Sequence, residues 1–413
     1  MNYYKRFPNG LRLIIKKMEG LYSVSCGVMV KTGSVNENEE NNGISHFIEH
    51  CLFKGTTSRS AFEISDSIDR IGAQINAYTS KESTCYYIKS TTEHFGEALE
   101  VLSDIFFNSV FDDKELEREK GVVLEEINMC EDTPEDLCLD LLAQSYFGER
   151  GLGQTILGSD NNIKRFTRSD LIKYINDRYT PDNVVISVAG NVDVKATEEM
   201  VYKLFVQNFK NNKLVETAEI IEKGVGNIHK SKDIEQCHLG IAMPAFSVID
   251  DKSDPLNLAN VVFGGGMSSR LFQKIREELG LCYSVYSYLS QYQNQGVVEI
   301  YSGVNNDSRE KSFDAIINEI KKFGSEGITE KEFLRAKEQV KSSFIMGQES
   351  TASQMLLYGR YLLYLNKEFD FEERIRKIDS VTINSVNEVI KEIFNVNKIS
   401  VATVGKAKTS LKI

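Results

Sequence analysis

The sequence has few cysteines, and they form no pattern that would build a disulfide framework. Seven cysteines are scattered over 413 residues, at positions 26, 51, 85, 130, 138, 237 and 282, with no C-x-x-C pair. An odd and dispersed set of this kind indicates a reducing compartment. The first residues, MNYYKRFPNG, contain neither an apolar leader nor an Arg/Ser-rich amphipathic segment. The sequence therefore predicts a cytoplasmic protein.

Long apolar runs and clusters of basic residues are also missing. No stretch of 18 apolar residues occurs, so a membrane is not an expected partner. The 60 acidic residues outnumber the 49 basic ones, and no Lys/Arg-rich run carries interleaved aromatic residues. Nucleic acid is therefore not an expected partner either. The glycines at 264–266 fit neither the G-x-x-x-x-G-K-[ST] nor the G-x-G-x-x-G spacing, which argues against a nucleotide site.

The chain repeats itself, and the repeat predicts its domain organisation. DKELEREK at 113–120 is answered by EKEFLRAK at 330–337. An Ile-x-x-Phe-Thr-x3-Leu pattern at 163–171 returns as Ile-x-x-Val-Thr-x3-Val at 378–386, and Ser-Val at 187–188 returns at 400–401. Three matches in one order at nearly one offset indicate two homologous halves. We therefore expect domains at 1–212 and 228–413, joined by a linker at 213–227.

Strand and helix patterns are mixed in both halves. Val24, Cys26, Val28 and Val30 alternate as in a half-buried strand. Helical patterns cover 94–107, about 113–130, 134–147, 254–263, 268–279 and 308–322, and Thr329-x-x-Glu332 is a capping box. Strands in meanders followed by helices predict an α+β fold with two homologous domains of mixed or antiparallel sheet packed with helices.

The sharpest local motif is His46-Phe-Ile-Glu49-His50, an H-x-x-E-H. On a helix the two histidines lie one turn apart on one face, with the glutamate beside them. Two imidazoles at this spacing can bind one Zn²⁺, and the glutamate is then placed to take a proton from water. The alternative is a pair of surface histidines on an amphipathic helix.

A catalytic zinc takes three protein ligands, and the helix near residue 120 offers carboxylates for the third. Glu119 and Glu126 are two turns apart on one face, whereas Glu125 points about 100° away, so helical phase favours the first two. The repeat supports this choice, because the second half has alanine at 336 and serine at 343 in the matching positions and no H-x-x-E-H. Taken alone, this helix would more often be a solvated charged face.

The motifs resemble the inverted-zincin (pitrilysin, M16) peptidases, and most of all the short-chain bacterial relatives of the mitochondrial processing peptidase β-subunit. The resemblance implies that His46, His50 and Glu126 are zinc ligands, Glu49 the general base and Glu119 a supporting acid. It also implies that Glu126 rather than Glu125 is the third ligand. The segments that carry the resemblance are NGLRLII (9–15), SVSCGVMVKTGS (23–34), GISHFIEHCLFKGT (43–56), INAYTSKEST (75–84), EREKGVVLEEINM (117–129) and FGGGMSSRLFQKIREELGLCYSVYSY (263–288).

The resemblance also implies the substrate contacts. A strand within Gly72–Thr84 would pair with a peptide by β-addition, which places Asn76, Ala77 and Tyr78 at the cleft. Phe53 would form a pocket wall, although it and Tyr78 could instead be core aromatics. Arg276 and Tyr283 would hold the substrate and stabilise the oxyanion.

Together these expectations describe a zinc-dependent endopeptidase for unfolded peptides, with two homologous domains enclosing a chamber. One metal-binding half and one Arg/Tyr half per chain imply a homodimer. The alternative is a non-catalytic peptide-binding or assembly subunit, since the resembling family contains such members without an intact metal constellation. A further alternative, a subunit that needs a different chain to supply the Arg/Tyr half, is disfavoured by the presence of both residues here.

Overall fold

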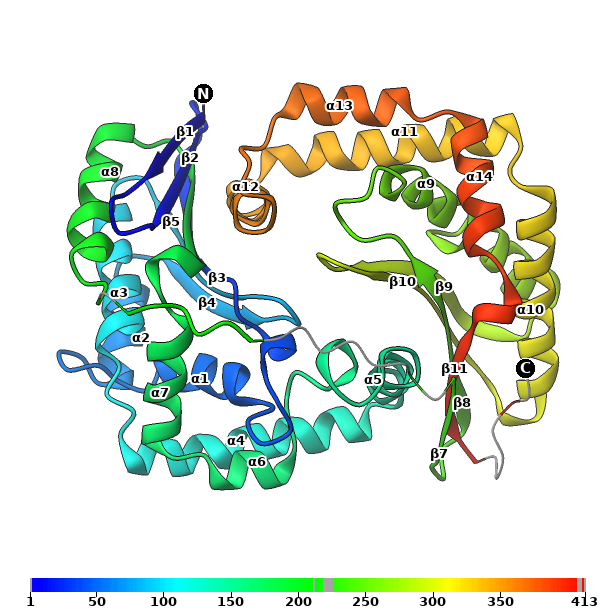
Figure 1. Cartoon of the computed structure of the whole chain (residues 1–413), viewed down its shortest axis with the longest axis horizontal. Coiled ribbons are helices and arrows are strands. Elements are labelled where there is room, and N and C mark those ends of the chain that lie inside the picture. Colours follow the sequence, from blue (N-terminus) through cyan, green and yellow to red (C-terminus); the bar gives the residue numbers. More distant parts are fainter. Residues whose placement is uncertain (1, 211, 218–223, 225, 407–410, 412–413) are drawn as a thin grey trace. The chain divides into compact units, whose positions relative to one another are not determined.

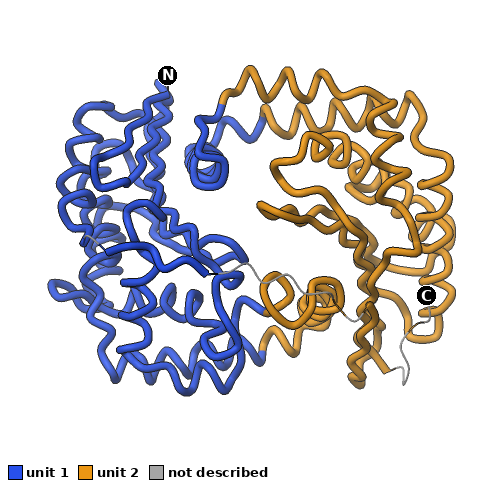
Figure 2. Tube along the Cα trace, in the orientation of Figure 1, with its two compact units in different colours: residues 1–128, 155–220, 346–369 blue, residues 129–154, 221–345, 370–413 orange. Residues whose placement is uncertain are grey.

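The computed structural model describes residues 2–210, 212–217, 224, 226–406 and 411 (Figure 1). The chain divides into two compact units (Figure 2). Unit 1 comprises residues 1–128, 155–220 and 346–369, and unit 2 comprises residues 129–154, 221–345 and 370–413. Each unit combines one sheet with several helices, which confirms the α+β class. In the described part of the chain, no helix is long and apolar enough to cross a membrane.

Unit 1 is built around a six-stranded sheet in the order β1-β2-β6-β3-β5-β4. β2 and β6 are parallel, and the other neighbouring pairs are antiparallel. β4 lies at one edge of this sheet, where β5 is its strand neighbour. The strands are β1 (Asn2–Arg6), β2 (Arg12–Lys17), β3 (Ser23–Val30), β4 (Gln74–Thr79), β5 (Thr84–Thr91) and β6 (Val184–Gly190).

Helices cover both faces of this sheet. α1, α3 and α8 pack on one face, and α12 packs on the other against β2, β3 and β6. Ser187 Oγ on β6 donates to the carbonyl of Met355 on α12 at 2.7 Å. The helices are α1 (Ile44–Leu52), α2 (Ala61–Asp69), α3 (Phe95–Asn108), α4 (Asp113–Asp132, entering unit 2 at residue 129), α6 (Asp160–Arg165), α7 (Arg168–Arg178), α8 (Val194–Val201) and α12 (Thr351–Leu365), with a π-helical turn at Tyr202–Val206.

β3 differs from the sequence-based expectation. Its alternating apolar residues predicted a half-buried strand, but every residue from Val24 to Val30 is buried. The second face is covered by α12, which comes from the other half of the sequence. Gly27 permits the contact, because a Cβ there would stand 2.4 Å from Met355 Sδ. The prediction was wrong because a local pattern does not reveal a helix that arrives from more than 300 residues away.

Unit 2 contains a five-stranded sheet in the order β7-β11-β8-β10-β9, in which β7 and β11 are parallel. α9, α10 and α14 pack over one face, and α5 packs on the other against β7, β8 and β11. The strands are β7 (Asn227–Ser231), β8 (Gln236–Ala245), β9 (Cys282–Gln291), β10 (Gly296–Asn305) and β11 (Ser400–Gly405). The helices are α5 (Pro134–Phe147), α9 (Ser253–Gly264), α10 (Arg309–Glu326), α11 (Glu330–Met346), α13 (Phe371–Ser380) and α14 (Ile383–Ile393).

The helix expected over 268–279 is only partly regular. The structure has a π-helical segment at Phe272–Glu278 instead of an α-helix of full length. A π-turn adds one residue per hydrogen-bonded ring, so the 3.6-residue pattern that predicted the helix does not distinguish it. Such segments occur frequently at functional sites.

The two halves of the sequence exchange one helix each (Figure 2). α5 comes from the first half and packs in unit 2, whereas α12 comes from the second half and packs in unit 1. In each unit a glycine of the sheet lies against a side chain of the exchanged helix: Gly27 of β3 faces Met355 of α12, and Gly240 of β8 faces Leu142 of α5. The two units are defined by contacts within the structure. The predicted domains, 1–212 and 228–413, are defined by internal sequence similarity, so they stay a prediction. The predicted linker, 213–227, lies partly outside the described residues.

Candidate metal centre

Helix α1 carries the H-x-x-E-H motif, and a buried carboxylate fixes its first turn. Glu37 Oε2 accepts a hydrogen bond from the amide of Gly43, and Glu37 Oε1 accepts one from the amide of Ser45, both at 2.8 Å. These amides lack partners within the helix, and negative charge is stabilising at a helix N-terminus. Gly43 has φ +98°, and a Cβ there would lie 2.7 Å from the carbonyl oxygen of Leu157. The local fold therefore anchors the turn that bears the first histidine.

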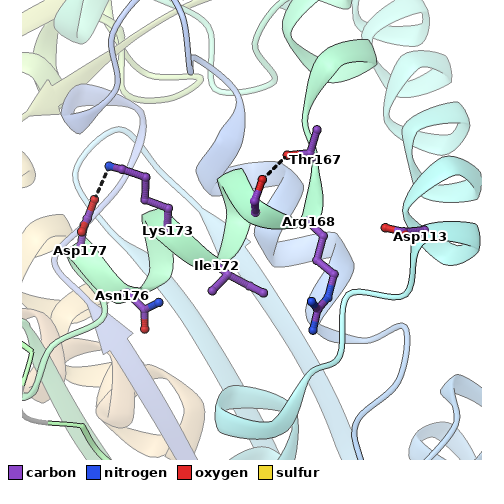
Figure 3. Close-up of a pocket in the computed structure, with 8 residues that line it drawn as sticks. Asp113, Thr167, Arg168, Ile172, Lys173, Asn176 and Asp177 are labelled. Carbon is purple, nitrogen blue, oxygen red and sulfur yellow. Dashed lines mark hydrogen bonds and ion pairs between the residues drawn. The ribbon is translucent and has the colours of Figure 1, made fainter.

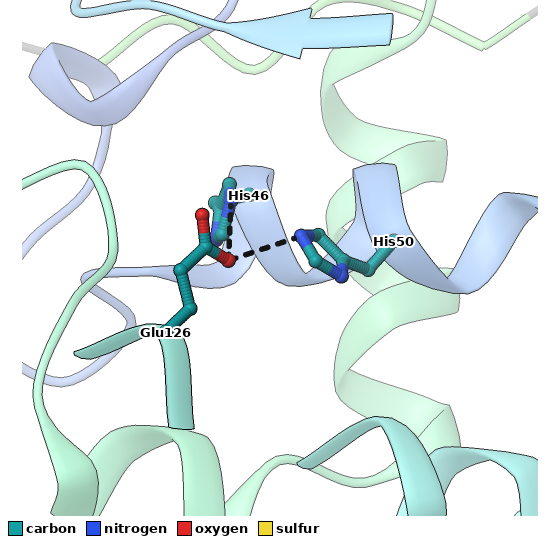
Figure 4. A group of neighbouring side chains, drawn as sticks. All are labelled: His46, His50 and Glu126. Carbon is teal, nitrogen blue, oxygen red and sulfur yellow. Dashed lines mark ion pairs between the residues drawn. The ribbon is translucent and has the colours of Figure 1, made fainter. Parts of the chain in front are cut away.

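His46, His50 and Glu126 converge, with ligand atoms all within 4.8 Å of one another (Figure 4). Glu126 Oε2 lies 3.6 Å from His46 Nε2 and 3.4 Å from His50 Nε2. Ligands at ~2.0–2.1 Å from a tetrahedral zinc are separated from one another by about 3.3–3.5 Å. Two imidazoles and a carboxylate at this spacing fit a catalytic zinc site, and the donor set also favours zinc over harder cations.

Both carboxylates of α4 that were expected near the H-x-x-E-H motif lie close to its histidines. Glu119 Oε1 lies 2.8 Å from His50 Nδ1, and Glu119 is only 3% exposed. Glu126 contacts the two histidines, whereas Glu125 is exposed on another face of the helix. In the tautomer that leaves His50 Nε2 free for a metal, His50 Nδ1–H donates to Glu119, and such partners orient metal-binding histidines. The seven-residue spacing on α4 therefore produces the predicted arrangement.

The surroundings of the two histidines shift their pKa values in opposite directions. Burial, and next the neighbouring His50, lower the pKa of His46 to about 4, although Glu126 opposes this shift. Burial also disfavours charge on His50, but the hydrogen bonds to Glu119 and Glu126 outweigh it and raise the pKa of His50 to about 9. His46 is therefore neutral at pH 7. A metal would have to displace a proton from His50 on binding.

Glu49 lies on the same helix and is held by a residue that the sequence did not single out. The hydroxyl of Thr79, at the end of β4, donates to Glu49 Oε2. Burial raises the pKa of Glu49, while the hydrogen bond from Thr79 opposes the shift. The only available signal was that Thr79 belongs to the strand already assigned to the cleft, one residue after Tyr78. The contact itself joins two elements that are 30 residues apart.

Three of the four expected substrate-contacting residues lie in the edge strand of the unit 1 sheet. Asn76, Ala77 and Tyr78 are central in β4, with Asn76 exposed and the other two half-buried. Tyr78 is held from α12, because Arg360 Nη2 donates to its hydroxyl at 3.1 Å and the guanidinium lies 5.5 Å from its ring centre. Phe53 is partly buried and packs against the core of unit 1. Its role as a pocket wall stays a prediction.

Arg276 and Tyr283 are brought together within unit 2. Arg276, in the π-helical segment, donates through Nη1 to the carbonyl of Tyr283 at 2.7 Å. Its guanidinium lies 4.7 Å from the ring centre of Tyr283 and 4.9 Å from that of Phe272. Tyr283 is 74% exposed at the start of β9. The seven-residue pairing is therefore a direct contact, and its role with substrate stays a prediction.

A concavity lies beside helix α7 and shares no residue with this centre (Figure 3). Three of its charged side chains already have partners within the protein. Lys173 forms an ion pair with Asp177 at 2.8 Å, and Arg168 Nε donates to the carbonyl of Val110 at 2.9 Å. We assign no ligand to it. The lining residues are Asp113, Thr167, Arg168, Ser169, Ile172, Lys173, Asn176 and Asp177.

Two models of known protein families match the chain. Residues 12–160 match the family model described as insulinase (peptidase family M16), and residues 165–340 match the model described as the peptidase M16 inactive domain. The chain belongs to peptidase family M16. This confirms the resemblance to the inverted-zincin peptidases that the motifs indicated.

Relatives of this M16 chain carry protease names. It is 42% identical over 94% of both chains to the "Uncharacterized zinc protease YmxG" of Bacillus subtilis, and 36% identical over 94% of both chains to an "Uncharacterized zinc protease" of Rickettsia felis. Among solved structures it is similar to a protease from Helicobacter pylori, with a TM-score of 0.90, 22% identity and coverage of 98% and 99% of the two chains. A structure from Pseudomonas fluorescens described as a peptidase M16 inactive domain also gives a TM-score of 0.90, at 20% identity over 98% of each chain. The structural likenesses confirm the two-domain α+β fold.

Proposed function

We propose that this M16 chain is a zinc-dependent endopeptidase that hydrolyses unfolded peptides. One observation carries the proposal: the carboxylate of Glu126 on α4 lies at the spacing of tetrahedral zinc ligands from both imidazoles of α1, and the three ligand atoms lie within 4.8 Å of one another. His46, His50 and Glu126 would hold the metal. The zinc protease names of the relatives support the same assignment.

The chain's own residues would then carry out the proton transfers. Zinc, when bound, supplies Lewis acidity to a peptide carbonyl and to water. Glu49 takes the proton from the attacking water and later delivers it to the leaving amine, so that no net proton is gained or lost. Thr79 holds one oxygen of Glu49, and the other oxygen would take part in the proton transfer. Arg276 and Tyr283 would donate hydrogen bonds to the developing oxyanion.

The edge position of β4 supports unfolded peptides as substrates. An extended peptide pairs with an edge strand through main-chain hydrogen bonds, which give affinity without a strict sequence requirement. An unfolded peptide can adopt the extended conformation that this pairing needs, whereas most of the backbone of a folded protein is already hydrogen-bonded. We further propose that the active species is a homodimer, in which the metal-binding half of one chain works with the Arg/Tyr half of the other, and that it acts in the cytoplasm.

The proposal is tested with a quenched, basic, unfolded peptide of about twenty residues and three proteins: the wild type, Glu49→Gln and Glu125→Gln. Bound zinc is quantified in all three. We expect about one zinc per chain in each, cleavage by the wild type and by Glu125→Gln, and loss of 10²–10⁴-fold in rate for Glu49→Gln. Glu125 is the matched control because it is an exposed glutamate of α4 adjacent to the ligand.

The remaining outcomes separate the alternatives. Absence of zinc from the wild type would contradict the metallopeptidase and favour a non-catalytic peptide-binding or assembly subunit. Zinc without cleavage, together with a monomeric mass on gel filtration, would indicate that a different chain must supply a partner half. Efficient digestion of a stable folded protein would contradict the substrate class.

A further inference from the structure

A lysine just beyond helix α1 shares the buried carboxylate that supports the metal centre. Lys54 Nζ lies 2.8 Å from Glu119 Oε2, while His50 Nδ1 lies 2.8 Å from Glu119 Oε1. The Glu119 side chain is 4% exposed and the Lys54 side chain 35% exposed. Each oxygen of one carboxylate therefore has its own partner, and one of these partners is a candidate metal ligand.

The ion pair connects the two elements that supply the candidate ligands. Lys54 follows α1 by two residues, and its amide donates to the carbonyl of Cys51 at 3.2 Å, so its backbone is tied to the last turn of that helix. Glu119 lies in α4, two turns before Glu126. A cation held by the end of one helix thus fixes a carboxylate on the other.

We propose that Lys54 is a positioning residue for the zinc site: by holding Glu119 Oε2, it fixes the carboxylate so that Oε1 orients the imidazole of His50 toward Glu126. The inference rests on the proposed zinc site. A carboxylate that is held at only one oxygen can rotate about its terminal torsion, which is broad in carboxylate side chains. Loss of an outer partner of a metal-binding histidine typically weakens metal affinity 10–100-fold.

The competing explanation is that Lys54–Glu119 is an ordinary ion pair with a role only in stability. The two explanations differ in what they predict for metal binding. A positioning role changes zinc affinity in a protein that is still folded, and it acts only through Glu119. A role in stability alone lowers the unfolding temperature and leaves the zinc affinity of the folded protein unchanged.

The test measures the zinc dissociation constant of metal-free protein by competition with a chromophoric chelator, so that no peptidase activity is needed. We expect about tenfold weaker binding for Lys54→Met and near wild-type binding for Lys54→Arg, which keeps the charge. The matched control is Arg118→Gln, which removes an exposed ion pair to Glu115 on the same helix, and we expect wild-type affinity. Circular dichroism shows whether each variant is folded, and Lys54→Gln replaces Lys54→Met if that variant is not.

A double-mutant cycle with Glu119 tests whether Lys54 influences zinc binding through Glu119. Glu119→Gln alone should weaken zinc binding, and adding Lys54→Met should change it by less than about twofold. Full additivity would overturn the proposal, because Lys54 would then act independently of Glu119. Wild-type affinity in Lys54→Met would also overturn it while leaving the proposed peptidase intact. Failure of the wild type to bind zinc would instead contradict the proposed function.

Discussion

The packing of α12 on the unit 1 sheet leads to a prediction in which two effects have opposite signs. Gly359 lies in the interior of α12, where alanine would ordinarily be favoured over glycine by about 0.8–1 kcal/mol. A Cβ at this position would stand 2.5 Å from Met29 Sδ and 2.9 Å from Ser187 Cβ. The end of Met29 can move, but Ser187 Cβ is attached directly to the backbone of β6. With an overpacking cost of about 2–3 kcal/mol, Gly359→Ala should lower the free energy of unfolding by about 1–2 kcal/mol.

Gly121 provides the matched control. It lies in the interior of α4, and a Cβ there would meet no atom within 4 Å. Gly121→Ala should therefore gain the helix propensity without a packing penalty and stabilise the protein by about 0.5–1 kcal/mol. The assay is thermal unfolding followed by circular dichroism, in which 1 kcal/mol corresponds to about 2–4 °C for a unit of this size. We expect the unfolding temperature to fall in Gly359→Ala and to rise in Gly121→Ala.

An increase in unfolding temperature for Gly359→Ala would refute the reasoning, because it would mean that α12 does not approach β3 and β6 as closely as described. A double variant sharpens the test. In the Met29→Ala background the methionine is no longer in the way, so Gly359→Ala should be less destabilising than in the wild type. Strict additivity of the two changes would show that the residues do not touch.

Three further predictions concern the site and the stability of unit 2. Thr79→Val should lower kcat about tenfold with unchanged zinc content and KM. Thr79→Ser keeps the hydroxyl that holds Glu49 and should retain activity. An equal loss of activity in both variants would contradict a role for this hydrogen bond. The Glu332 carboxylate accepts two hydrogen bonds from the Arg270 guanidinium and one from the amide of Thr329. These hydrogen bonds lower the pKa of Glu332 to about 2 despite burial. The resulting stabilisation, about 1–2 kcal/mol after allowance for screening, is present above pH ~4.5 and is lost as the pH falls toward 2. Glu332→Gln should therefore lower the unfolding temperature at pH 7 but not at pH 2, and a difference that persists at pH 2 would exclude this cause. Incubation with a chelator should abolish peptide cleavage and added zinc should restore it, whereas full activity in chelator would contradict a metallopeptidase.

Local patterns located most of the elements. The helix expected over 94–107 is α3 at Phe95–Asn108, and the expected capping box opens α11, where the amide of Thr329 donates to Glu332 Oε2 at 2.8 Å. Helix periodicity and capping involve residues only three or four positions apart, so they can be read directly from the chain. The features that local patterns did not predict have a different origin. The burial of both faces of β3 and the exchange of α5 and α12 depend on partners far away in the sequence.

The arrangement of the metal centre follows in large part from the sequence alone. The spacing of His46 and His50 places two imidazoles on one face of a helix, and the seven-residue separation of Glu119 and Glu126 places two carboxylates on one face of another. Helical geometry enforces both, because 3.6 residues per turn leave little freedom in where those side chains point. What the sequence did not determine is which residues support this set. Lys54 contacts Glu119 from 65 positions away in the sequence, and Thr79 contacts Glu49 from 30 positions away. A contact between distant segments leaves no local pattern, so only the packing of α1 against α4 and β4 decides it.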